Sequence, residues 1–337
     1  MKKEKTALFW KKVKGKVVQC KLCPRFCVIN ERERGNCGVR ENQNGKLVSL
    51  VYGKPCAANV DPLTKKPIFH MLPGSNSYSI GTAGCNLACK YCQNWEISQT
   101  KPEDVPSLDL LPEAVVEAAI LNECKSVAYT YTEPVATAYE YVFDTAKLAN
   151  KKRIKNVEVS NGFINQGPLK KLLPLLDAAN IDFKGDNDFY KKIAGAWAKP
   201  VQETLIALKR KKVWLEVTNL IVPTLNDSAQ KIKWLVDWIL DNLGEDVPLH
   251  FSAFWPTYKL MHLPSTSLQT LKNARRIAMK AGLLYVYTGN LPYEEGNNTY
   301  CPRCGKVLIK RSGFYVIENL LERGKCPCGE KIAGVWK

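Results

Sequence analysis

The chain has 337 residues, 45% of them hydrophobic and 24% charged, the balance of a globular protein with one large domain and one or two small ones. Its formal net charge is +17, which would suit an acidic partner or nucleic acid. The basic residues are scattered, however, so a solvated lysine-rich surface is the favoured interpretation. No apolar run approaches the roughly 18–20 residues of a membrane span, and the apolar block at residues 7–10 is too short for a secretion signal. The sequence therefore predicts a cytoplasmic protein with no membrane partner.

Residues 1–75 are expected to form a small cysteine-rich N-terminal segment. Val48–Val51 is a short strand candidate, and residues 61–74, rich in proline and lysine, are expected to be a connection. In a chain without an export signal, cysteines in tight groups indicate metal binding rather than disulfides. The four cysteines here suit zinc or an auxiliary iron–sulfur cluster, and their spacing favours neither. They are Cys20, Cys23, Cys27 and Cys37.

Strand and helix patterns alternate through residues 76–296, the expected core domain. This alternation predicts a parallel sheet, either barrel-like or doubly wound. No Gly-x-Gly-x-x-Gly follows the first strand, so the dinucleotide fold lacks its usual support. The expected strands are Tyr78–Gly81, Ser126–Tyr131, Asn156–Ser160, Asn180–Lys184, Val213–Val222, Pro248–Phe254 and Leu283–Tyr287, and the expected helices are Pro112–Glu123, Ala136–Asn150, Pro168–Asp177, Val201–Lys211, Ser228–Leu243 and Ser267–Ala281.

Three cysteines at C-x3-C-x2-C spacing follow directly after the first expected strand. One short loop can aim Cys85, Cys89 and Cys92 at a single point, as a soft-metal or iron–sulfur site requires. Structural zinc needs four ligands, so zinc would require a distant fourth such as Cys56 or His70. A [4Fe–4S] cluster held by three cysteines keeps one iron open for a reacting ligand, and the spacing favours this interpretation.

Polar residues recur near the carboxyl ends of the expected strands, where parallel βα barrels collect their functional groups. With a period of two, each pair shares one face of its strand. Charged groups inside a barrel are costly unless they are paired or bound to a polar ligand, so we expect them to face a ligand cavity. The pairs are Glu158 and Ser160, Asp182 and Lys184, Glu216 and Thr218, and His250 and Ser252.

These motifs resemble the radical S-adenosylmethionine (radical SAM) superfamily. The three-cysteine loop carries an aromatic residue, Tyr91, immediately before its last cysteine, as that superfamily does. Within it the chain is similar to the pyruvate formate-lyase activating enzymes, through Thr132-Glu133-Pro134, Ser160-Asn161-Gly162 and Asp182-Phe183-Lys184. Over nearly its whole length it is most similar to the AmmeMemoRadiSam system radical SAM enzymes. The resemblance implies a partial (βα)6 TIM-like barrel.

The resemblance also implies a cofactor site. Cys85, Cys89 and Cys92 would hold a [4Fe–4S] cluster, S-adenosylmethionine would bind its open iron, and Tyr91 would lie against the adenine. Reductive cleavage would then yield methionine and a 5′-deoxyadenosyl radical, with the electron supplied by a donor such as flavodoxin or ferredoxin. Glu133 is the expected contact to the methionine amino group. The other candidate contacts to cofactor or substrate are Ser160, Asn161, Asp182, Lys184 and, more weakly, His250.

Residues 297–337 are expected to form a zinc-ribbon-like C-terminal module. Two thiol pairs on successive turns, separated by strand-like stretches at Val307–Lys310 and Phe314–Ile317, are typical of such a module. The second pair is one residue shorter than the usual C-x2-C, and unbound thiols are the alternative. The candidate zinc ligands are Cys301, Cys304, Cys326 and Cys328.

Three functions are consistent with the sequence. The first is a radical enzyme, an oxidoreductase, that abstracts hydrogen from a glycine of a protein substrate. The second directs the same chemistry at a small molecule or nucleoside. The third is a non-catalytic, metal-stapled protein that binds nucleic acid. Resemblance in fold and cofactor does not decide the substrate.

Overall fold

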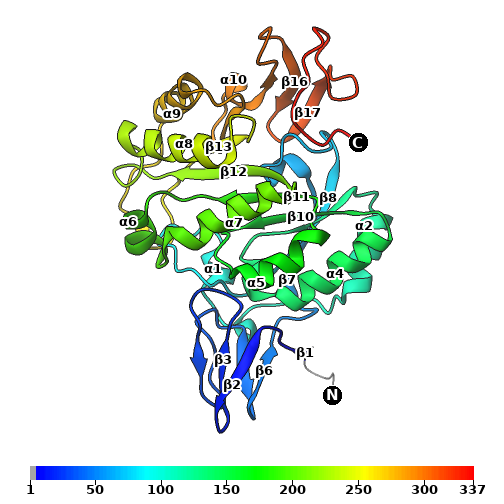
Figure 1. Ribbon diagram of the computed structural model, residues 1–337, viewed down its shortest axis with the longest axis vertical. Coiled ribbons are helices and arrows are strands. Elements are labelled where there is room, and N and C mark those ends of the chain that lie inside the picture. The colour runs from blue at the N-terminus through cyan, green and yellow to red at the C-terminus, as the bar shows by residue number, and fades with distance from the viewer. Residues whose placement is uncertain (1–4) are drawn as a thin grey trace.

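The computed structural model describes residues 5–337. A central eight-stranded sheet lies between the N-terminal strands at one end of the molecule and the C-terminal strands at the other (Figure 1). In the part of the chain that is described, no helix combines the length and apolar character needed to cross a membrane. The architecture is α/β with a largely parallel sheet, as the sequence predicts.

The central sheet follows chain order from β8 to β14, with each strand parallel to the next. Strand β7 pairs antiparallel with β8 and forms one edge, while β14 forms the other. Six helical connections join successive parallel strands, so the predicted partial barrel is confirmed. The strands are β7 Pro55–Pro62, β8 Asn76–Thr82, β9 Ser126–Tyr129, β10 Lys155–Ser160, β11 Ala178–Asp182, β12 Trp214–Ile221, β13 Leu249–Ala253 and β14 Val286–Gly289.

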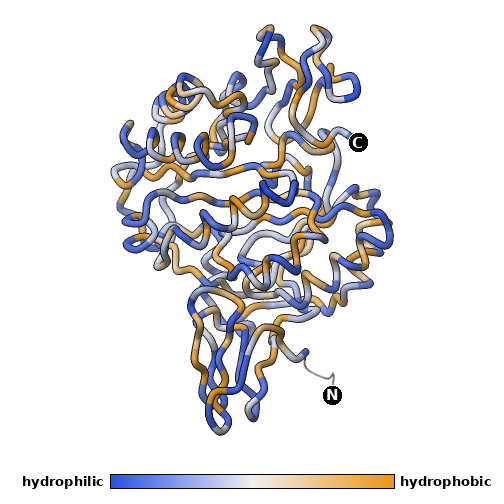
Figure 2. Tube along the Cα trace, in the orientation of Figure 1, coloured by the Kyte–Doolittle hydropathy of each residue, from blue (hydrophilic) through white to orange (hydrophobic). Residues whose placement is uncertain are grey.

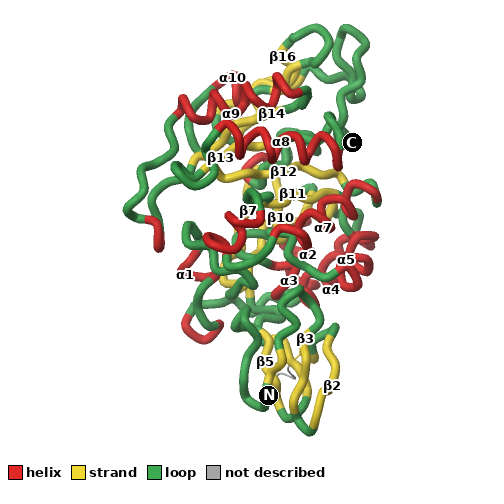
Figure 3. The backbone as a smooth tube through the Cα atoms, turned by 60° about the vertical axis from the view of Figure 1, so that its left-hand side comes forward, coloured by secondary structure: helices red, strands yellow, loops and turns green. Residues whose placement is uncertain are grey.

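Helices lie outside the strands of the central sheet (Figure 3). Hydrophobic and hydrophilic residues recur in turn along the longer helices α4, α7, α8 and α9, so that each of these has an apolar face to pack on the sheet (Figure 2). Ser228 illustrates how a helix begins, because its hydroxyl accepts the Lys231 N–H at the start of α8. The helices are α1 Trp95–Ser98, α2 Pro112–Leu121, α3 Pro134–Thr137, α4 Tyr139–Lys151, α5 Gln166–Leu172, α6 Asn187–Phe189, α7 Ala198–Arg210, α8 Ala229–Leu243, α9 Leu268–Ala281 and α10 Glu294–Asn297.

The segment 63–71 fills the interior of the barrel at the amino-terminal end of its strands. Leu63, Ile68 and Met71 are buried against Ala178, the first residue of β11, and against neighbouring strands. Polar contacts fix the segment, since the Asn180 side chain donates to the Pro67 carbonyl at 2.7 Å. The sequence predicted only a connection here, because three apolar residues among prolines and lysines give no periodic signal.

Six short strands form two three-stranded antiparallel sheets before the barrel. The sequence predicted one strand in this region; lysines obscure the period of two in β2, and the other strands are only two to four residues long, too short to show a period. These strands are β1 Lys5–Thr6, β2 Trp10–Lys14, β3 Val17–Cys20, β4 Val28–Ile29, β5 Arg40–Gln43 and β6 Lys46–Ser49.

The C-terminal module is a third small antiparallel sheet, and it packs on the last strand of the barrel. Leu308 and Ile309 of the module are buried with Tyr285, Tyr287 and Phe69 in one apolar cluster. The predicted domain limits at residues 75/76 and 296/297 remain predictions. The strands of the module are β15 Thr299–Tyr300, β16 Val307–Ser312 and β17 Tyr315–Asn319.

Candidate functional site

A cavity of about 1020 Å³ opens at the carboxyl ends of the parallel strands. The three-cysteine loop lines one end of it, and the hairpin formed by β16 and β17 lines the other. The cavity therefore brings together residues from most of the chain. The predicted site residues that line it are Cys85, Cys89, Cys92, Tyr91, Ser160, Asn161, Asp182, Lys184 and His250.

The three-cysteine loop follows β8 directly, and two of its thiols, those of Cys85 and Cys92, have hydrogen-bond partners. The Leu87 N–H donates to Cys85 Sγ at 3.4 Å, and the Asn161 side-chain amide approaches the same sulfur at 3.7 Å. Cys92 Sγ and Ser98 Oγ lie 3.2 Å apart. Donors of this kind stabilise thiolates, which are the form that binds iron. The donor set of this loop therefore fits an iron–sulfur cluster.

Burial dominates the electrostatics of these thiols. It raises the pKa of Cys85 well above its usual range and that of Cys89 to about 11, the latter opposed by the positive charge of Lys184. Lys184 is buried and pairs with Asp182 at 2.8 Å. Its ammonium group lies 5.8 Å from the centre of the Tyr91 ring. A cationic group thus sits between the cysteine loop and the strand ends, where a carboxylate of a ligand would be stabilised.

Glu133 is buried immediately behind the cavity wall. Its carboxylate accepts hydrogen bonds from the Asn161 N–H at 2.7 Å and from the Ser160 hydroxyl at 2.9 and 3.1 Å, and it also caps α3 through the Ala136 N–H. Burial raises its pKa to about 7, against these hydrogen bonds, which lower it. Glu133 therefore holds two cavity residues in place, and its predicted contact to the methionine amino group stays a prediction.

His250 reaches the cavity from β13 and is anchored beneath it. Its Nε2 lies 2.6 Å from the carboxylate of Glu216. Glu216 also accepts the backbone N–H groups of Phe69 and His70, at 2.9 and 2.8 Å. Burial alone would raise the pKa of Glu216, but the contacts with His250, His70 and Trp214 together outweigh it, and the pKa is lowered. An ionised carboxylate therefore fixes the orientation of the imidazole.

The expectation that Glu158 faces the cavity is wrong. Val157 packs in the interior cluster with Leu63 and Val159 lines the cavity, so Glu158, which lies between them, points to the opposite face of β10. There its carboxyl is buried, and burial together with Glu133 raises its pKa to about 8. The sequence prediction failed here because it assigned the face from polarity alone. A glutamate buried beneath the helices gives the same sequence pattern as one that faces a ligand.

The sequence also missed an ionic network at the side of the cavity. Asp61 pairs with Lys66 at 2.6 Å and accepts the Tyr131 hydroxyl at 2.5 Å. Lys66 and Tyr131 both line the cavity. Tyr131 has a φ of 70°, in the left-handed region that is uncommon for a residue with a side chain. No motif marks this network, since Asp61 lies 70 positions from Tyr131 in the sequence.

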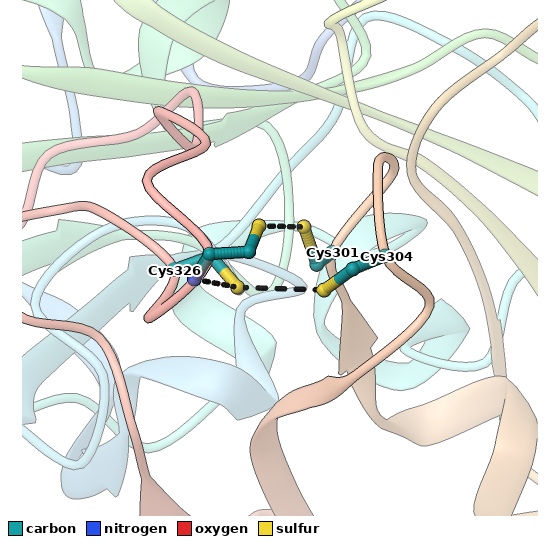
Figure 4. Close-up of side chains that lie close together, drawn as sticks. Cys301, Cys304 and Cys326 are labelled. Carbon is teal, nitrogen blue, oxygen red and sulfur yellow. Dashed lines mark hydrogen bonds between the residues drawn. The ribbon is translucent and has the colours of Figure 1, made fainter.

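The C-terminal cysteine set (Cys301, Cys304, Cys326 and Cys328) lies outside the cavity lining and forms a compact group of its own. Its ligand atoms all lie within 4.8 Å of one another (Figure 4). The sulfur atoms of Cys301 and Cys328 are 3.7 Å apart, as are those of Cys304 and Cys326. A group this compact could bind a metal ion.

The N-terminal cysteine set (Cys20, Cys23, Cys27 and Cys37) is also gathered in one place and is also absent from the cavity lining. Cys20 ends β3, and Cys37 lies just before β5. The carbonyl of Cys37 comes so close to Gly84, at the start of the three-cysteine loop, that a Cβ on Gly84 would lie 2.6 Å from it. This cysteine set is therefore in contact with the loop that carries Cys85.

Comparison with known proteins agrees with this geometry. Residues 79–239 match the family model of the radical SAM superfamily. These residues, from β8 to α8, therefore form a radical SAM domain. An uncharacterized protein of Methanocaldococcus jannaschii is 47% identical over 97% of this chain and 98% of its own length. The pyruvate formate-lyase-activating enzyme of Clostridium pasteurianum is 26% identical over 160 residues, 46% of this chain and 66% of that enzyme.

A solved structure shows the same fold. A radical SAM methyltransferase from Sphaerobacter thermophilus superimposes with a TM-score of 0.52 and 13% identity, over 67% of this chain and 68% of that one. The match to the radical SAM family model supports an enzymatic function, and the likeness to the Clostridium enzyme extends over less than half of this chain. The family implies a [4Fe–4S] cluster and S-adenosylmethionine as cofactors, and the three-cysteine loop supplies ligands that fit the cluster.

Proposed function

We propose that this protein is an oxidoreductase that cleaves S-adenosylmethionine reductively and uses the 5′-deoxyadenosyl radical to take hydrogen from a glycine in a protein substrate. The cluster would supply the electron that breaks the C5′–S bond. The residues proposed to hold S-adenosylmethionine are Tyr91, Ser160, Asn161, Asp182, Lys184 and His250, which line the cavity, with Glu133 behind it.

The extent of the cavity supports a large substrate. Its volume of about 1020 Å³ is at the top of the range of about 300–1,000 Å³ typical of pockets for one small molecule. Because the cofactor would occupy part of this space, a large substrate would insert only a segment and rest on the rim. Phe314 and Ile317 of the C-terminal hairpin border it and are 48% and 61% exposed. Exposed apolar residues beside a cavity are suited to contact with a peptide. The Clostridium relative, as its name says, activates another enzyme.

The second candidate is a small anionic substrate. It is favoured by the basic residues of the cavity wall, which include Lys65, Lys66, Lys310 and Arg311. Cationic side chains in a partly enclosed site attract carboxylates and phosphates.

Deuterium transfer distinguishes the two candidates. Cells that carry this gene would be grown with α-deuterated glycine, and their extract separated into protein and low-mass fractions. Each fraction would be incubated anaerobically with the reconstituted enzyme, S-adenosylmethionine and dithionite. The proposal predicts deuterium in 5′-deoxyadenosine from the protein fraction, whereas transfer from the low-mass fraction alone would support the second candidate.

The hairpin gives a matched pair of variants for this assay. F314A/I317A is expected to lower deuterium transfer from the protein fraction while leaving substrate-free S-adenosylmethionine cleavage unchanged. L121A is the control, because Leu121 is 83% exposed and is not among the residues that line the cavity. Equal transfer by both variants would contradict a role for the hairpin.

We also propose that the C-terminal cysteine set binds one structural zinc ion. Zinc–sulfur bonds of about 2.3 Å at tetrahedral angles place sulfur atoms about 3.8 Å apart. Two sulfur pairs of the set are each 3.7 Å apart. The ion would hold together a small module that has little apolar core of its own.

A further inference from the structure

The four thiols of the N-terminal cysteine set form a single site. The loop between Cys20 and Cys27 folds back on itself, with the Cys20 N–H donating to the Cys27 carbonyl at 2.9 Å. Cys23 interacts electrostatically with Cys37, Cys20 and Cys27, although Cys37 comes from a separate turn before β5. Two loops thus converge on one point.

Nitrogen donors are directed at two of these sulfur atoms. Arg40 Nη1 lies 3.7 Å from Cys20 Sγ. Cys27 Sγ accepts the N–H of Asn36, the residue before Cys37, at 3.4 Å, which ties the second loop to the first. Cys20 and Cys27 therefore act as acceptors, as metal-bound thiolates do.

The two isolated cysteines behave in the opposite way. Cys124 Sγ points at the Asn122 carbonyl at 3.7 Å, and Cys56 Sγ points at the Gly81 carbonyl at 3.6 Å. A carbonyl oxygen only accepts, so these two are S–H donors and neutral thiols. Cys85, in the loop that the family assigns to a cluster, accepts an N–H instead. By this criterion Cys20 and Cys27 resemble Cys85 rather than the two isolated thiols.

A buried cation also faces the set. Arg40 is 1% exposed, and its Nη1 lies 3.7 Å from Cys20 Sγ. Its other terminal nitrogen pairs with Glu140 at 2.6 Å, while its Nε has no hydrogen-bond partner among the described residues. A buried guanidinium is costly unless anions surround it. Four thiolates around a metal centre supply that negative charge.

The spacing of the thiols distinguishes a cluster from a single ion. Within residues 5–337, the C-terminal set is the one group in which three or more candidate ligand atoms all lie within 4.8 Å of one another. The N-terminal thiols are spread more widely, as are those of Cys85, Cys89 and Cys92, which the family assigns to a four-iron cube. We propose that the N-terminal cysteine set binds a second iron–sulfur cluster, of the [4Fe–4S] type, through four thiolates.

Its position suits a relay of electrons into the first cluster. The Cys37 carbonyl packs against Gly84, the residue before Cys85. Arg25, between two ligands of the set, donates to the carbonyl of Asn86 at 2.6 Å. Residues 5–40 contain ten lysines and arginines against two glutamates, which suits an acidic electron-carrier protein of the flavodoxin or ferredoxin class.

The relay rests on the proposed function, whereas the metal site does not. In the relay the reduced second cluster loses one electron and the oxidised first cluster gains it. The first cluster would pass this electron to S-adenosylmethionine, whose C5′–S bond is cleaved. The external one-electron carrier then reduces the second cluster again.

Metal analysis tests the site directly. Wild-type protein would be reconstituted anaerobically with iron, sulfide and zinc, beside the variant C85A/C89A/C92A. The proposal predicts about eight irons per chain in the wild type and about four in the variant, the latter with the Mössbauer signature of a [4Fe–4S] cluster. A variant that holds zinc or no metal at the N-terminal set would overturn it. If the variant does not fold, the metal content of the wild type decides the question. Four irons and two zinc ions per chain would mean that the N-terminal cysteine set holds zinc, and the proposal would be overturned.

A single-turnover experiment tests the relay. Protein reduced and freed of excess reductant would be mixed with S-adenosylmethionine, and 5′-deoxyadenosine counted per chain. Two stored electrons predict up to about two equivalents in the wild type, against about one in C23A/C27A. One equivalent from both would refute the relay but leave the metal counts standing. No 5′-deoxyadenosine from either would refute the proposed function, and the iron count would still decide whether the second cluster exists.

Discussion

Replacing His70 should flatten the dependence of stability on pH in mildly acidic solution. His70 is fully buried; its Nδ1–H donates to the Ala333 carbonyl at 2.7 Å and its Nε2 accepts the Tyr287 hydroxyl at 2.5 Å. Burial lowers the pKa of His70 to about 4; Glu216 opposes this effect, while Arg311 adds to it. The native state therefore keeps this imidazole neutral.

The sign and size of the effect follow from linkage. An unfolded histidine has a pKa of about 6.5, so on acidification the unfolded chain binds the proton first. Stability is full above about pH 6.5 and is lost as the pH falls towards 4. At about 1.4 kcal/mol per pKa unit, the loss reaches about 2 kcal/mol at pH 5 and about 3 kcal/mol near pH 4.

Urea unfolding followed by tryptophan fluorescence at pH 8, 7, 6 and 5 measures this loss. H70Q should be less stable than the wild type at pH 8, but its decrease between pH 7 and pH 5 should be smaller by about 2 kcal/mol. H262Q is the control, because His262 is exposed and should leave the slope unchanged. The thiols and carboxylates are the same in the wild type, H70Q and H262Q, so their titration cancels when the three slopes are compared. The same slope in H70Q and the wild type would refute the assignment of a neutral buried His70.

Three further substitutions test the site and its supports. E133Q should weaken S-adenosylmethionine binding by about 10- to 100-fold in calorimetry, since a charge-assisted hydrogen bond contributes about 1.5–3 kcal/mol; unchanged affinity would remove Glu133 from the site. G84A should lower the free energy of unfolding by about 2–5 kcal/mol and reduce iron content, because it combines left-handed strain with a clash against Cys37. G15A is its control, with a φ of 54° and nothing within 4 Å, and a loss as large as that of G84A would argue against the clash. C304S should abolish zinc binding in native mass spectrometry and lower the melting temperature, whereas retained zinc would contradict the proposed ligand set.

Local patterns made the barrel predictable. The strands of the parallel sheet are short apolar runs separated by amphipathic helices, and each was placed within a few residues of its observed bounds. The three-cysteine loop was found because its ligands are contiguous. Ser160, Asp182, Lys184 and His250 were found because parallel strands end at a common edge, so residues at those ends share one cavity.

Contacts between distant parts of the chain were not predictable. Arg40 pairs with Glu140 across 100 positions, and segment 63–71 fills the barrel interior through hydrogen bonds such as that from His70 to Glu216. No spacing in the sequence encodes such a pair. The same holds for Glu158, whose face depends on which side of β10 the neighbouring helices cover. Sequence reasoning therefore found many of the residues that line the cavity and missed most of the long-range contacts that hold them in position.

The central claim is tested most directly by 5′-deoxyadenosine formation. Anaerobically reconstituted wild-type protein would be incubated with S-adenosylmethionine and dithionite, beside C89A and, as a control for loss of a neutral thiol, C124A. The account predicts 5′-deoxyadenosine from the wild type and C124A and none from C89A. Absence of the product in the wild type, or equal amounts from C89A, would contradict it.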